Sequence, residues 1–76
     1  MEEAIIKYIS GVADEKGIKV EMDEDLFQNG VLDSFGFLML LSYLQDSFAI
    51  EFEEDDMKPE NFMSIHAIIR FCESRK

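Results

Sequence analysis

The chain has 76 residues, of which 47% are hydrophobic, and its 17 aspartates and glutamates against 7 lysines and arginines give a formal charge of −10. This length allows one domain, residues 1–76, with one modest core. The hydrophobic content is that of a folding chain and excludes a disordered acidic tail. The negative charge repels the phosphates of nucleic acids and anionic membranes, so neither is expected as a partner.

The sequence carries no pattern of export or membrane insertion. The N-terminus lacks the basic and then apolar order of a signal peptide, and no apolar run is long enough to cross a bilayer. The single cysteine, Cys72, has no partner for an internal disulfide, so packing alone must hold the fold. We therefore expect a small acidic domain that is monomeric and cytoplasmic.

The first element in chain order is a helix from Glu2 to Lys16. Its apolar residues recur at steps of three and four and form one face: Ile5, Ile9, Val12 and Ala13. Glu2 and Glu3 stand where the helix dipole favours acids, and Gly17 is placed to end the helix with a positive φ.

This periodicity is absent between residues 17 and 33. Alternating apolar residues there would suit a short strand, although no second strand is apparent to pair with it: Ile18, Val20 and Met22. Asn29 and Gly30 form a turn signal. Other residues are too apolar for a solvated linker: Leu26, Phe27, Val31 and Leu32. The stretch is therefore predicted to be a long ordered loop that lies on the core.

The second long helix is predicted from Asp33 to Phe48. Asp33 is a good N-cap residue, which places Ser34 in the first turn. At about 100° per residue, the apolar residues of this segment gather on one broad face that is expected to enter the core. They are Phe37, Leu40, Leu41, Leu44 and Phe48.

The rest of the chain predicts an acidic loop, a short helix and a final helix. The acidic run Glu51–Asp56 is interpreted as a solvated loop, and Pro59 suits the first position of a short helical turn through Phe62. Ser64 is expected to cap the last helix, whose apolar face holds Ile65, Ile68, Ile69 and Cys72. The predicted fold class is therefore all-α, a bundle of three main helices and one short one.

A calcium loop does not fit the acidic stretch that precedes Ser34. An EF-hand loop that starts at Asp23 or Asp25 places Phe27 where an oxygen ligand belongs. The reading from Asp25 also puts Gly36 in place of the closing glutamate. No specific metal site is predicted.

Catalysis by the chain alone is not expected either. The possible nucleophile and base, Cys72 and His66, are six residues apart on one helix and point about 120° apart. Cys72 is interpreted as a core residue and His66 as a surface residue near a helix start. Ser34 has no evident general base in the sequence.

A family resemblance connects these elements. The stretch "DEDLFQNGVLDSFGFLMLLSYLQDSFAIEF", followed by an acidic loop and a closing amphipathic helix, resembles the acyl carrier protein family, which also includes D-alanyl and peptidyl carriers. Asp-Ser alone is a weak motif, whereas "DLF", "NG", "VLDS" and the apolar helix at these spacings are far more specific. The resemblance covers essentially the whole chain and implies the four-helix carrier bundle, with its long loop between helices 1 and 2.

The resemblance assigns roles to two residues. Ser34 matches the serine that receives covalent 4′-phosphopantetheine from coenzyme A, and Asp33 matches the aspartate before it, a helix cap that the phosphopantetheinyl transferase recognises. Two positions depart from the family pattern. Phe35 stands where leucine or methionine is usual, and Met39 stands where fatty-acid carriers commonly have an acid. The second departure leaves the identity of the partner enzymes open.

The implied function is that of a non-catalytic carrier, which holds an acyl group as a thioester on the arm and delivers it to acyl-loading and acyl-transferring enzymes. A fatty acyl cargo, and with it fatty acid biosynthesis or related lipid metabolism, is the first expectation, because the chain has enough apolar side chains to line a pocket between helices. An amino acid cargo, as in D-alanyl or peptidyl carriers, is the alternative. An unmodified helical interaction module is the competing class.

A docking surface is predicted on the face of the second helix that turns away from the core. At about 100° per residue, Phe35, Met39, Ser42 and Asp46 fall on one strip beside Ser34. Two large apolar side chains next to the attachment serine are typical of a contact site. Gly36 is expected to let a partner or the arm approach closely, and Asp46 to lie at the rim.

Overall fold

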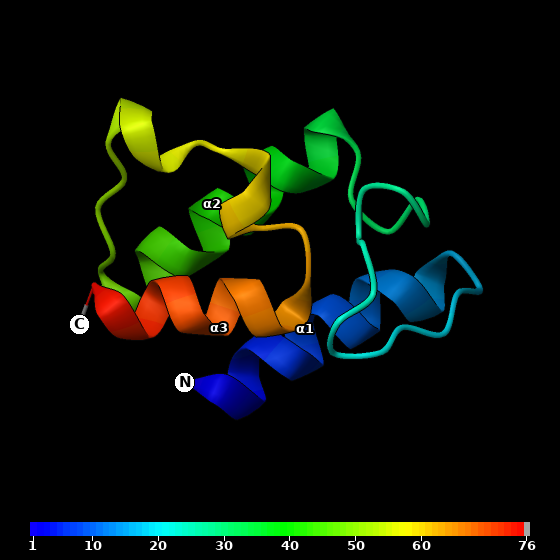
Figure 1. The fold of residues 1–76 in the computed structure, drawn as a ribbon. Coiled ribbons are helices and arrows are strands. Elements are labelled where there is room, and N and C mark those ends of the chain that lie inside the picture. The colour runs from blue at the N-terminus through cyan, green and yellow to red at the C-terminus, as the bar shows by residue number, and fades with distance from the viewer. Residues whose placement is uncertain (76) are drawn as a thin grey trace.

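The computed structural model describes residues 1–75, and all the regular elements in this range are helical. The three long helices are α1 (Glu2–Glu15), α2 (Ser34–Phe48) and α3 (Ile65–Ser74), and two 3₁₀ turns, η1 (Glu54–Asp56) and η2 (Pro59–Asn61), lie between α2 and α3. In Figure 1, α1 and α3 run in opposite directions, and the long α1–α2 loop lies at one end of the molecule. The prediction of an all-α bundle with three main helices is confirmed, with one addition, η1, in the acidic loop.

The end of α1 is fixed by a hydrogen-bond pattern at its glycine. The amide of Gly17 donates to the carbonyl of Asp14 at 3.0 Å, and the amide of Ile18 donates to the carbonyl of Ala13 at 2.8 Å. Gly17 has φ 71°, so these are the two bonds of a Schellman cap, which requires a left-handed residue. Lys16 is the C-cap, and the helix ends one residue earlier than expected.

The long loop is ordered and lies on the core, as predicted. Leu26 and Val31 are fully buried, and the amide of Leu26 donates to the carbonyl of Met63 at 2.6 Å. The amide of His66 likewise donates to the carbonyl of Met22 at 3.0 Å. The strand suggested for residues 18–22 is absent from the described structure, because this segment bonds to the start of α3 and has no partner strand.

An aromatic cluster joins the second half of the chain to α2. Phe62 is fully buried, and its ring lies 5.2 Å from that of Phe37 on α2 and 5.2 Å from that of Phe71 on α3, centroid to centroid. Phe52 stacks on Phe71 at 5.7 Å. Phe62 directly follows η2 and lies between α2 and α3. Its ring therefore fixes the start of α2 relative to α3. The remaining core is aliphatic apart from Cys72 and comes from all three long helices, the α1–α2 loop and Ile50 after α2.

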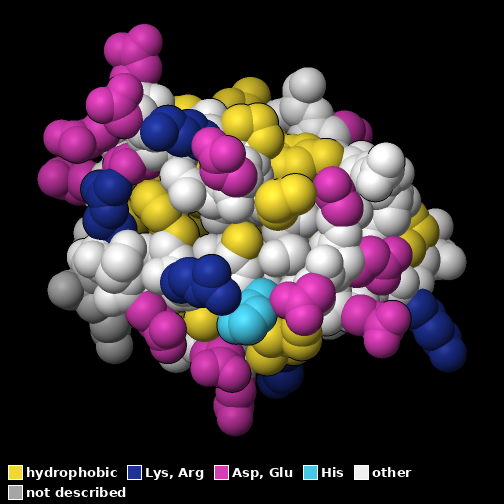
Figure 2. Space-filling view, viewed as in Figure 1, with side chains coloured by type: hydrophobic (Ala, Val, Ile, Leu, Met, Phe, Trp, Pro, Cys, Tyr) yellow, Lys and Arg dark blue, Asp and Glu magenta, His cyan; other side chains and the backbone are white. Residues whose placement is uncertain are grey.

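One residue of the acidic loop departs from the solvated loop that was expected. Figure 2 shows acidic side chains gathered over η1, at the upper left of the view. Asp56, however, is only 5% exposed. Its carboxylate accepts the amide of Glu53 at 2.8 Å and the guanidinium of Arg75, whose charge lies 5.0 Å over the ring of Phe71. The prediction of a solvated loop is therefore wrong at Asp56. Its carboxylate can be buried because it is both paired with a cation and hydrogen-bonded. No helix within residues 1–75 has the length and apolar character needed to span a bilayer.

Candidate functional site

The candidate site is centred on Ser34, the first residue of α2. Asp33 is the N-cap, with extended backbone (φ −109°, ψ −172°), and its Oδ1 accepts the amide of Gly36 at 2.6 Å. Ser34 is exposed, and its hydroxyl lies at the positive end of the helix dipole. The expected cap and the first-turn position of the serine are both present. Its role as an attachment point stays a prediction.

The carboxylate of Asp33 is held in its charged form. The hydrogen bond from the Gly36 amide, more than the nearby Lys16 ammonium, lowers the pKa of Asp33 below its usual value. The close approach of Gly36 also explains the glycine, because a Cβ there would lie 3.1 Å from Asp33 Oδ1. Asp33 therefore acts as an anionic cap at neutral pH, and a larger residue at position 36 would crowd it.

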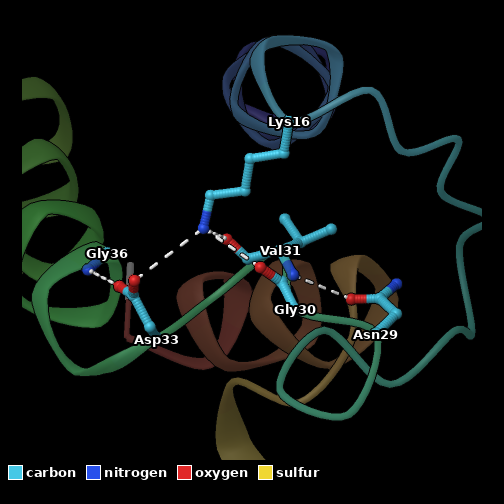
Figure 3. A network of polar contacts seen from close by, with 6 residues as sticks. All are labelled: Lys16, Asn29, Gly30, Val31, Asp33 and Gly36. Carbon is cyan, nitrogen blue, oxygen red and sulfur yellow. Dashed lines mark hydrogen bonds and ion pairs between the residues drawn. The ribbon is translucent and has the colours of Figure 1, made fainter.

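Lys16 is a part of the site that sequence reasoning missed. Its ammonium donates to the carbonyls of Gly30 and Val31 at 3.0 and 3.1 Å, and it lies 3.9 Å from Asp33 Oδ2. Figure 3 shows the side chain reaching from the end of α1 to the segment that leads into α2. Lys16 and its partners are 14 to 17 positions apart across an irregular loop, and no helical or strand periodicity predicts a contact over that distance in the sequence. The contact therefore had no local sequence signal.

A turn at Asn29 and Gly30 shapes the same segment. Gly30 has φ 86°, and Asn29 Oδ1 accepts the amide of Val31 at 3.0 Å. The sequence predicted this turn, and the structure shows what it does. It brings the carbonyls of two successive residues to one lysine (Figure 3), after which the buried Leu32 leads to Asp33 and α2.

Two surface hollows lie on either side of the attachment residues. One of about 470 Å³ is lined largely by apolar side chains, with Asp33 and Ser34 at its edge: Phe27, Leu32, Phe37, Met57 and Pro59, together with the backbone of Gly30. The other, of about 330 Å³, lies between α1 and α2 and includes Lys16, Phe35 and Met39 in its lining. Apolar space next to Ser34 is thus available to a group attached there.

The outward strip of α2 lies where the sequence placed it. Phe35 is 71% exposed and Met39 is 50% exposed, and Ser42 and Asp46 are exposed as well. Leu38, which sequence reasoning missed, is 61% exposed and extends the apolar part of the strip. Its spacing of three residues from Phe35 was a usable signal. Gly36 is half-buried beside the Asp33 cap.

The structure keeps the other candidate nucleophile away from this site. Cys72 is fully buried in the core, where desolvation raises the pKa of its thiol to about 11. His66 is exposed, and its Nδ1 lies 3.0 Å from Asp23 Oδ1. Within residues 1–75, the potential metal ligands His, Cys, Asp and Glu form no group of three or more. Asp25 of the acidic stretch instead caps its own turn by accepting the amides of Phe27 and Gln28 at 3.0 and 3.1 Å.

Comparison with known proteins gives a consistent set of relatives. No family model matches the chain. A D-alanyl carrier protein of Lactococcus lactis subsp. lactis is 29% identical over 76 residues, which is 100% of this chain and 96% of that protein. A D-alanyl carrier protein of Bacillus velezensis is 29% identical over 65 residues, covering 79% of this chain and 83% of that protein. This similarity along the whole chain, on an all-helical fold, confirms the resemblance to the carrier protein family.

Proposed function

We propose that the chain is an aminoacyl carrier of the D-alanyl type, which holds D-alanine as a thioester on a 4′-phosphopantetheine arm attached to Ser34. The observation that carries the proposal is the exposed serine at the first position of α2, behind an aspartate cap, in a chain similar over its full length to D-alanyl carrier proteins. The chain itself would catalyse nothing. A separate phosphopantetheinyl transferase supplies the base and the metal, and recognises Asp33 with Ser34.

The residues at Ser34 fit a phosphodiester. The hydroxyl is exposed at a helix N-terminus, where the dipole favours an anion by about 0.3–1 kcal/mol at an exposed site. The Lys16 ammonium, 3.9 Å from Asp33 Oδ2, adds a positive charge near the same helix end. When bound, the arm supplies a thiol that forms the thioester and keeps the cargo at a local concentration on the order of millimolar within a docked complex.

The relatives favour an amino acid over the fatty acyl cargo that was first expected. Their names specify D-alanine, so they support the alternative and give no support to a fatty-acid pathway. The hollow of about 470 Å³ beside Ser34 is lined largely by apolar side chains and has room for either cargo, so the choice of D-alanine is based on the relatives.

Partner enzymes are proposed to dock on the strip of α2 formed by Phe35, Gly36, Leu38, Met39, Ser42 and Asp46. Three large apolar side chains on this strip are at least half exposed, which is more than a scattered surface hydrophobe, and they begin one residue after Ser34. The partners are the transferase, the enzyme that loads the cargo and the enzyme that receives it. Because coenzyme A donates the arm, modification is proposed to occur in the cytoplasm.

Mass spectrometry tests the attachment. The protein is incubated with coenzyme A and a broad-specificity phosphopantetheinyl transferase, and one phosphopantetheine mass should be added to the wild type. Ser47→Ala is the matched control, because Ser47 is also an exposed serine on α2, lies outside the docking strip and should leave the addition unchanged. Ser34→Ala should abolish it. A folded wild type that gains no mass, or a Ser34→Ala protein that does, would refute the assignment.

The cargo is tested on protein purified from its native host. Hydroxylamine cleaves thioesters, so it should release a hydroxamate of alanine from the arm, and chiral chromatography of the product should give the D form. Recovery of a fatty acyl hydroxamate would overturn the D-alanyl proposal while leaving the attachment at Ser34 in place.

A further inference from the structure

Lys16 joins three segments of the chain at the attachment site. It is the C-cap residue of α1, and its ammonium contacts two carbonyls in the loop and one carboxylate at the start of α2. An ammonium has three N–H donors. The carbonyl oxygens at 3.0 and 3.1 Å accept two of them, and the Asp33 carboxylate at 3.9 Å forms an ion pair beyond hydrogen-bond distance (Figure 3).

These contacts act on the residues that hold Ser34 in place. The Gly30–Asp33 segment is irregular. The carbonyls of Gly30 and Val31 lie outside any helix and therefore have no helical amide as a hydrogen-bond donor. The lysine therefore fixes this segment from the side of α1, while Leu32 anchors it in the core. Asp33 in turn begins α2 through its bond to the Gly36 amide. Loss of the ammonium would loosen the segment immediately before the helix cap.

Charge gives Lys16 a second role once Ser34 is modified. Asp33 is already an anion, and a phosphodiester on the adjacent residue would add another in a chain whose formal charge is −10. Two neighbouring anions repel each other, and a cation beside them offsets this repulsion. Lys16 lies in the lining of the hollow between α1 and α2 together with Asp33, and its side chain is only 36% exposed. Its charge is therefore less screened than that of a fully solvated lysine.

We propose that Lys16 is a positioning residue of the attachment site: it holds the Gly30–Asp33 segment that presents Ser34, and it offsets the charge that modification adds beside Asp33. The proposal rests on the proposed function, since it concerns the modified form. It distinguishes Lys16 from a lysine that merely stabilises the fold. A purely structural contact would matter equally before and after modification, whereas a charge-offsetting contact must matter more afterwards.

The test compares the unmodified and modified forms of Lys16→Gln. Glutamine keeps a hydrogen-bond donor but removes the charge, and Lys19→Gln makes the same charge change at an exposed residue nearby. At low salt, Lys16→Gln should lower the Tm of the modified form by about 2–4 °C more than that of the unmodified form, because only the attraction to the added phosphodiester differs between the forms and a partly exposed charge pair contributes little. Lys19→Gln should shift the Tm of both forms equally. Lys16→Arg keeps the charge and should therefore largely abolish the extra loss of Tm in the modified form.

NMR of the wild type provides a second measurement that does not depend on any variant. The Nζ and Cε signals of Lys16 should move when Ser34 is modified, whereas those of Lys19 should stay in place. The proposal is overturned if Lys16→Gln lowers the Tm of both forms equally, or if the Lys16 signals do not respond to modification. Failure of the proposed function would look different, because wild-type Ser34 would then gain no mass and no modified form would exist to compare.

Discussion

Replacing Met39 with glutamate should weaken binding of partner enzymes without harming the fold. Met39 lies on the outward strip of α2, between Leu38 and the core residue Leu40, and half of its surface is exposed. The fold does not depend on burying that exposed half. A docked partner would bury it, so an anion at this position should act on the complex and leave the isolated protein unchanged.

The magnitude follows from the exposed area. Complete burial of a methionine side chain contributes about 1.5–3 kcal/mol, so the exposed half of Met39 can contribute about 1 kcal/mol on docking. Glutamate loses that contribution and must also give up part of its hydration in an apolar contact. The sum, on the order of 1–2 kcal/mol, corresponds to a Kd about 5–30 times higher.

The assay is the concentration dependence of modification by the phosphopantetheinyl transferase, and of loading by the enzyme that activates the cargo. Met22→Glu is the matched control. It makes the same substitution at a methionine that is 36% exposed and lies beside His66 and Ile69, in the hollow bordered by α3. Met39→Glu should raise KM with little change in Tm, whereas Met22→Glu should leave KM unchanged. Moderate salt should weaken binding only mildly, since screening acts on exposed charges. Equal KM values for the two variants, or affinity that collapses in modest salt, would refute a mainly apolar docking strip.

Four further outcomes follow from the structure and the proposed modification. Phe62→Ala should cost about 3–5 kcal/mol in urea denaturation, a large part of the roughly 4–11 kcal/mol that a domain of this size has, and a cost below about 1 kcal/mol would contradict its central place in the aromatic cluster. At neutral pH the unmodified protein should show no fast-reacting thiol toward iodoacetamide, and the modified protein should show one. Because burial raises the pKa of Cys72 from 9.0 to about 11, its contribution to stability is present below pH 9 and is lost as the pH rises toward 11. Cys72→Val should therefore flatten the fall of Tm above pH 9. Finally, moderate salt or millimolar divalent cation should raise the Tm by screening the acidic groups around Glu21–Asp25 and Glu51–Asp56, and an unchanged Tm would show that their repulsion is negligible.

The parts of the fold that the sequence could predict are those with local signals. The helices follow from apolar spacing, and their ends follow from residues with one clear conformational role, such as Gly17, Asp33 and Ser64. The first-turn position of Ser34 follows in the same way from its neighbour. The outward position of Phe35 was also predictable, because a helix with one broad core face leaves the opposite face in solvent.

The parts that could not be predicted depend on contacts between residues distant in the sequence. Asp56 resembles the other acids of a charged run; its bond to the Glu53 amide is local, but its charged partner is Arg75, which the end of α3 brings back to it. Lys16 reads as a solvated residue next to a glycine, and only the path of the loop brings two carbonyls to it. For each of these residues, the contact that the sequence does not reveal is with a partner 14 or more positions away.

The two thiols of a modified chain would have to behave differently for thioester chemistry to be clean. Transfer of a cargo requires a reactive, mobile thiol, and a second accessible thiol on the same chain could accept the cargo by exchange. Cys72 is fully buried and its pKa of about 11 leaves almost no thiolate at neutral pH, so it cannot compete. Ser34 is exposed at the surface, directly after the Asp33 cap. The fold thus separates a protected core thiol from an exposed hydroxyl on a rigid helix start, and this separation is what a passive carrier needs from its own residues.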